Sequence, residues 1–213
     1  MDKKDIRYFS SLLTKLEELG TRHAGKQFTA SELTTLIRRQ LPSIDFIVRT
    51  TRDTAVDPDM VVVSGLYDNH DDKQKIPSIT ITLCYHPVQD VYFVDLLNWK
   101  QFSFDIAECV GHELVHRKQH HDGSIQLMKP FRSKHLDGRI KEDQEYLGAD
   151  DEIEAYGFSI ASEMHTFKKP INECIMYNVY RATFETDPQI VTRLEKHVDN
   201  YYERLEQEYE QSA

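Results

Sequence analysis

The spacing of apolar residues predicts helices at both ends of the chain. Near the N-terminus apolar residues recur three or four positions apart, which is the period of an amphipathic helix: Ile6, Phe9, Leu12, Leu13, Leu16 and Leu19. Thr29 and Glu32 have the spacing of a capping box and predict the start of a second helix. Towards the C-terminus we expect one helix opened by Pro170 and another begun by Asp187 and Pro188.

Between these ends the pattern changes to that of strands. Segments 44–51, 60–66, 77–85 and 91–95 are rich in apolar and β-branched residues. In the third segment Ile79, Ile81 and Leu83 alternate with more polar residues, as in a half-buried strand. We therefore expect an α+β fold, in which N-terminal helices and a small, mostly antiparallel sheet precede further helices.

A helical stripe after the predicted sheet carries the motif with the clearest chemistry. Phe104, Ala107, Val110 and Leu114 share one helix face, Asp105 or a slightly earlier residue is the expected start, and Gly123 is the expected stop. On this helix His112 and His116 lie one turn apart, so both imidazoles can reach one metal ion, with Glu113 beside a metal-bound water. This pattern is typical of zinc peptidases.

A catalytic zinc ion needs a third protein ligand and an open position. A histidine shortly after the motif is excluded, because Gln119 and Asp122 occupy the positions that would hold a glycine and that histidine. Segment 148–158 instead predicts a second helix with a carboxylate in its first turn, capped by Asp150 or Asp151. Cys109 is a weaker alternative ligand.

The motif His112-Glu113-x-x-His116, followed by Glu152-x-x-Ala155, resembles the gluzincin metallopeptidases. The resemblance is greatest to small, free-standing members and to short metallopeptidases encoded by bacteria and phages, and it covers only these two helices. It implies a zincin-like fold and Glu152 as the zinc ligand, with Glu154 as the rival. Thermolysin-like enzymes have an aspartate four residues after the ligand glutamate, where this chain has Tyr156, so support for the ligands must come from elsewhere or from the tyrosine hydroxyl.

The expected function is zinc-dependent hydrolysis of a protein or peptide substrate, with Zn²⁺ held by His112, His116 and Glu152 and with Glu113 as general base. In zincins the edge of a sheet holds an extended peptide, and segment 79–84 is either that edge or an ordinary inner strand. The alternatives are a zincin-scaffold binding or regulatory protein with little or no turnover, and a structural protein in which the motif is accidental.

Residues 117–149 are predicted to form a long basic loop, since residues 117–141 contain seven Lys or Arg against two Asp. Such a loop is either a lid over the cleft or a solvent-exposed loop without a functional role. Tyr146, Tyr156 and His135 are candidates for stabilising a transition state, whereas His120 and His121 are expected on the surface.

Chain length, net charge and cysteine content indicate the domain count, the class of partner and the cellular compartment. A chain of 213 residues is expected to form a single domain, 1–213. The formal net charge of −10 argues against nucleic-acid binding, and no apolar run is long enough to span a membrane. Three widely spaced cysteines and an N-terminus without a signal-peptide core predict a cytoplasmic protein. The oligomeric state is not predicted.

Overall fold

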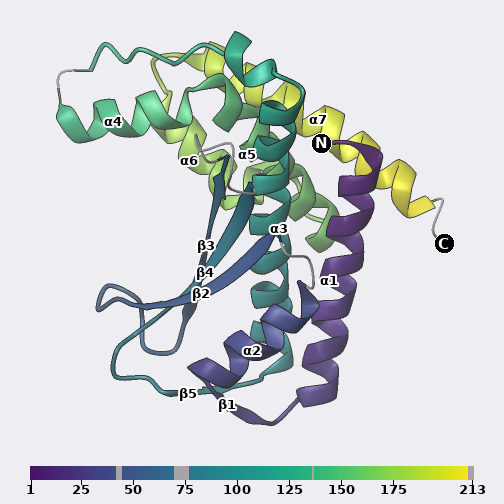
Figure 1. The fold of residues 1–213 in the computed structure, drawn as a ribbon. Helices are drawn as coiled ribbons and strands as arrows, with labels where there is room; N and C mark the ends of the chain where they lie inside the picture. Colours follow the sequence, from purple (N-terminus) through teal and green to yellow (C-terminus); the bar gives the residue numbers. More distant parts are fainter. Residues whose placement is uncertain (42–44, 70–76, 136, 211–213) are drawn as a thin grey trace. The chain divides into compact units, whose positions relative to one another are not determined.

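A computed structural model describes residues 1–41, 45–69, 77–135 and 137–210 of the chain. The chain divides into two compact units. The sheet unit comprises Arg7–Leu114, and the helical unit comprises Met1–Ile6 together with Val115–Ala213. The division falls within one continuous helix, α3 (Leu96–His121). The predicted α+β class is confirmed, with helices and a small sheet in the described residues (Figure 1).

The sheet unit contains most of α1 and two small sheets. Its elements are α1 (Lys3–His23), β1 (Gln27–Thr29), α2 (Ala30–Gln40), β2 (Phe46–Arg52), β3 (Val61–Asp68), β4 (Ser78–Tyr85), β5 (Val91–Phe93) and the first part of α3. β1 pairs with β5 in antiparallel fashion, and the other three strands lie in the order β2-β4-β3 (Figure 1). β4 is parallel to β2 and antiparallel to β3, so two of the three pairs described are antiparallel.

The suggestion that segment 79–84 is an edge strand is wrong, and its alternative as an inner strand is right. β4 lies between β2 and β3. Ile79 and Ile81 on one face are buried, whereas the other face is buried at Thr80 and half-buried at Thr82 and Cys84. The edges of the three-stranded sheet are β2 and β3.

Helix boundaries follow the expected signals at some positions and not at others. The capping box is present, because Glu32 donates its N–H to the Thr29 hydroxyl (3.2 Å) and Thr29 donates its N–H to the Glu32 carboxylate (2.8 Å). α3 begins at Leu96, well before Asp105, and ends at His121. The start of the strand predicted from residue 44 lies outside the described residues.

The helical unit consists of the end of α3 and the elements that follow it. These are η1 (Ser124–Leu127), α4 (Gly138–Leu147), α5 (Asp150–Phe167), η2 (Ile171–Glu173), α6 (Ile175–Thr183) and α7 (Pro188–Glu210). α5 packs along α7, and Gly157 permits this approach: a Cβ at this position would lie 2.5 Å from the Cβ of His197. The buried residues Phe158 and Leu194 belong to the core of this unit.

The long irregular loop expected at 117–149 is largely helical, which corrects that prediction. The last turn of α3, η1 and α4 account for much of the segment. α4 is capped by Asp137, whose carboxylate accepts the backbone N–H groups of Arg139 and Ile140. Residue 149 precedes α5 without a side-chain cap, and Asp150, one of the two predicted caps, instead pairs with Arg193. These helices are exposed and consist mainly of charged and polar residues, so the spacing of apolar residues did not predict them.

Two further features bear on the sequence predictions. Within the described parts of the chain, we find no helix with the length and apolarity needed to cross a bilayer. Cys84, Cys109 and Cys174 are free thiols.

Candidate metal centre

Helix α3 places the two histidines of the motif one turn apart. Four residues of α-helix advance by about 6 Å, so His112 and His116 project from successive turns on one side of the helix. His112 and Glu113 are buried, and the His116 side chain is 14% exposed. Because α3 is continuous across the motif, helix geometry fixes the backbone spacing of the two histidines.

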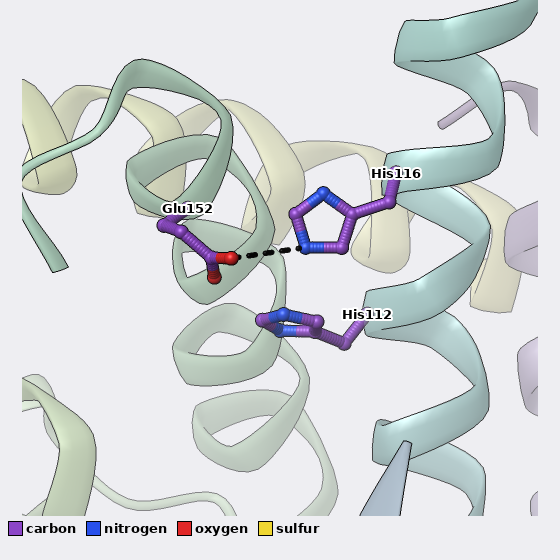
Figure 2. Close-up of side chains that lie close together, drawn as sticks. All are labelled: His112, His116 and Glu152. Carbon is purple, nitrogen blue, oxygen red and sulfur yellow. Dashed lines mark ion pairs between the residues drawn. The ribbon is translucent and has the colours of Figure 1, made fainter. Parts of the chain in front are cut away.

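Glu152 from the first turn of α5 completes a cluster with these histidines. One ligand-type atom from each of His112, His116 and Glu152 lies within 4.8 Å of the others. Figure 2 shows the two rings projecting from α3 and the carboxylate facing them from α5, with Glu152 Oε1 3.7 Å from His116 Nε2. Two imidazole nitrogens and one carboxylate oxygen are the donor set of many catalytic zinc sites, which leave a further position open.

Gln119 orients the ring of His116, a role that was not among the sequence predictions. The Gln119 side-chain NH₂ donates to the Asp151 carbonyl and to Glu154 Oε2, both at 3.1 Å. Its oxygen therefore faces His116 Nδ1, at 3.0 Å, and an amide oxygen at this distance requires an N–H on Nδ1. In the neutral ring, the lone pair is then on Nε2, the nitrogen that faces Glu152, as a metal ligand requires.

Glu154, the rival ligand, has a different position from Glu152. It accepts hydrogen bonds from Gln119 and from the Tyr201 hydroxyl, the latter at 2.8 Å, and Tyr201 in turn accepts the Met1 amino group at 3.3 Å. Burial by itself raises the pKa of Glu154, but these hydrogen bonds outweigh burial and hold the pKa below its ordinary value. Glu154 therefore supports the side chain that orients His116 and does not belong to the cluster.

Glu113 is held by the edge strand β3 within the sheet unit. Its Oε2 accepts the backbone N–H of Tyr67 at 2.7 Å. Gly65 on the same strand lies so close that a Cβ there would be 2.6 Å from Glu113 Oε1 and 2.7 Å from the sulfur of Cys109. A glycine at 65 thus gives the carboxylate the room that it occupies. Cys109 is outside the metal cluster, and burial raises the pKa of its thiol well above the ordinary value.

The three candidates for transition-state stabilisation lie in different surroundings. The Tyr146 side chain is half exposed, and desolvation together with the nearby Glu152 and Tyr156 raises the pKa of its hydroxyl. The ring of Tyr156 packs against Tyr180 at 5.7 Å. His135 is exposed and lines a separate hollow with residues such as Gln144 and Thr183, none of which belongs to the cluster. Of the three, Tyr146 has the surroundings that suit the role.

Comparisons of the chain with models of protein families, with curated proteins and with solved structures each gave no match.

Proposed function

We propose that the protein is a zinc-dependent peptidase with a zincin-like fold. The observation that carries this proposal is the convergence of His112, His116 and Glu152, on the helix whose Glu113 is anchored beside a strand edge. The alternative that the motif is accidental does not account for a carboxylate from α5 at the two imidazoles, nor for the Gln119 amide that fixes the tautomer of His116.

The donor set fits Zn²⁺, which supplies a Lewis acid that polarises water and the peptide carbonyl when it is bound. Glu113 takes a proton from the attacking water and passes it to the leaving nitrogen, because a carboxylate is a competent base and acid within hydrogen-bond reach. Tyr146 donates its hydroxyl proton in a hydrogen bond to the oxygen that gains negative charge. Gln119 keeps the His116 ring in a fixed orientation throughout.

The substrate that best fits this arrangement is an extended polypeptide. β3 is an edge of its sheet, and the Tyr67 N–H that binds Glu113 points away from β4. In an antiparallel strand every second residue directs its backbone groups to the same side, so Gly65 and Val63 direct theirs to that free edge as well. A peptide aligned with this edge gains backbone hydrogen bonds next to the proposed base.

The test pairs metal analysis with cleavage of a peptide library. We expect the purified wild-type protein to bind one zinc ion and to cleave peptides. Glu113→Gln keeps the size and shape of the side chain but removes its basicity. The variant should therefore retain zinc while its rate of peptide cleavage falls by about 10³-fold. Glu142→Gln, an exposed glutamate on α4, is the matched control and should cleave as the wild type does.

Two outcomes would contradict the proposal. Normal cleavage by Glu113→Gln would show that Glu113 is not the base. Stoichiometric zinc without cleavage of any peptide in the library would instead favour a binding or regulatory protein built on the same scaffold.

A further inference from the structure

One hollow of the sheet unit has a lining that includes none of the three residues of the metal cluster. It has a volume of about 810 Å³ and is lined by residues of β1, α2, β3, β5 and the first turns of α3, together with the segments beside these strands. This volume is within the range of protein sites that bind organic ligands, roughly 300–1,000 Å³. None of the residues His112, Glu113 and His116 lines it, so the hollow needs an explanation of its own.

Aromatic rings and carboxylates together line this hollow. Its aromatic residues are Phe28, Tyr92, Trp99 and Phe102. Its charged residues are Asp59, Asp95 and Asp105, and the described lining includes no lysine, arginine or histidine. Aromatic faces and carboxylates both attract cations, and the rings also bind apolar groups. The lining therefore selects a ligand that is both apolar and positively charged.

One face of α3 connects residues of the hollow with the proposed base. Phe102, Asp105, Cys109 and Glu113 are spaced three or four residues apart, so they follow one another along one side of the helix. The first two line the hollow, and the last two lie against Gly65 of β3. β3 makes the same connection, because Val61 at its start lines the hollow and Tyr67 near its end binds Glu113.

The length of this connection matches a few residues of extended chain. Eight residues of α-helix separate Asp105 from Glu113, a rise of about 12 Å. A polypeptide in extended conformation covers that distance with about four residues. A substrate cleaved beside Glu113 therefore reaches the hollow with a side chain about four positions from the broken bond.

We propose that this hollow is a substrate subsite that binds a basic residue, with an apolar neighbour, about four positions from the cleaved bond. The inference rests on the proposed peptidase function and adds a substrate class to it: polypeptides with basic, apolar segments. Asp59 and Asp105 supply the charge that recognises the basic side chain, and Phe102 and Trp99 supply the apolar contact.

Trp99 makes occupancy of the hollow measurable without any cleavage. It is the only tryptophan of the chain, and its indole N–H donates to the Leu16 carbonyl at 2.7 Å, which fixes the ring in the wall. We would titrate the wild-type protein with a ten-residue peptide of alternating lysine and phenylalanine, and with its counterpart in which glutamate replaces lysine. The basic peptide should change the Trp99 emission saturably, with an affinity at least tenfold higher than that of the acidic peptide.

Variants locate this binding. Asp59→Asn with Asp105→Asn should weaken binding of the basic peptide at least tenfold, and Asp59→Asn alone, at an exposed position, should weaken it measurably if the double variant does not fold. Glu18→Gln removes an exposed charge from α1 outside the hollow and should change nothing. Equal binding of both peptides, unchanged binding by the variants, or binding only of a small organic cation such as tetramethylammonium would overturn the inference.

A cleavage profile separates this inference from the proposed function. Library peptides cut by the wild-type protein should be enriched in lysine or arginine about four positions from the cut, and the double variant should lose this enrichment. Cleavage without such enrichment would contradict the proposed subsite but not the peptidase function. If the protein binds the basic peptide through Asp59 and Asp105 but cleaves nothing, the peptidase function is contradicted and a basic-peptide binding site remains.

Discussion

Glu113 in the sheet unit and His116 in the helical unit are held in different ways, each by residues of its own unit. In the sheet unit Glu113 is positioned by backbone: the Tyr67 N–H binds it, and the missing side chain of Gly65 makes room for it. In the helical unit His116 is positioned by side chains, through Gln119 and then Glu154. A backbone anchor survives most substitutions, whereas each link of a side-chain network can be removed singly. The two units should therefore respond differently to mutation.

The largest effect is expected from removing a ligand itself. His116→Ala deletes one of three protein donors, so the purified variant should contain almost no zinc and show no cleavage above background. Metal analysis by mass spectrometry measures the loss. His121→Ala, an exposed histidine at the end of the same helix, should keep its zinc. Full zinc occupancy in His116→Ala would remove this residue from the proposed ligand set.

The backbone anchor of the sheet unit is tested by Gly65→Ala. The new Cβ would meet Glu113 Oε1 at 2.6 Å and displace the carboxylate. A shift of about 1 Å in a catalytic group costs about 100-fold in rate, so kcat should fall by that factor while zinc content stays unchanged. Gly138→Ala is the matched control, since a Cβ there meets nothing within 4 Å. An unchanged kcat in Gly65→Ala would show that the Glu113 carboxylate makes room for the new Cβ without losing its catalytic position.

The side-chain network of the helical unit is tested by Gln119→Ala. Loss of the amide frees the His116 ring to rotate, and outer partners of metal ligands contribute about 10–100-fold to metal affinity. Zinc competition with a chelator should show a loss in that range, with kcat preserved at saturating zinc. Gln126→Ala, an exposed glutamine in η1, should bind zinc as the wild type does. A fall in kcat without any loss of affinity would assign Gln119 a role in the reaction itself.

The smallest effect is expected at the far end of the network. Tyr201→Phe removes the hydroxyl that donates to the Glu154 carboxylate, and a hydrogen bond to a charged group contributes about 1.5–3 kcal/mol to the free energy of unfolding. Urea denaturation should show that decrease, with zinc affinity nearly unchanged because Gln119 still binds Glu154. Tyr202→Phe, a neighbouring tyrosine on α7, provides the comparison. Equal stability of the two variants would mean that the Tyr201 hydroxyl contributes nothing measurable.

The elements that carry the ligands could be predicted from the sequence, because helix periodicity and the i, i+4 spacing are local properties. The same local pattern placed His112, His116 and Glu152 on two helices, and the structure brings these three residues together. Strand order is not a local property, which is why alternation in segment 79–84 could not distinguish an edge from the centre of a sheet.

The contacts that support Glu113 and Glu154 could not be predicted from the sequence, for two reasons. The bond between Glu113 and the Tyr67 N–H uses a backbone donor, and every residue except proline has one. The contact of Glu154 with Tyr201 joins residues 47 positions apart. Gln119 is the exception: it lies three residues after His116 on the same helix, and this spacing alone places the two side chains side by side.

The anchor of Glu113 also determines what natural variation at residue 67 can reveal. The donor belongs to the main chain, so Tyr67 can be replaced by nearly any other residue and the Glu113 carboxylate keeps its hydrogen-bond partner. Proline alone removes the donor. A survey of related sequences that ranks positions by identity would pass over residue 67 and draw attention to the glycine two positions before it, although both serve the same carboxylate.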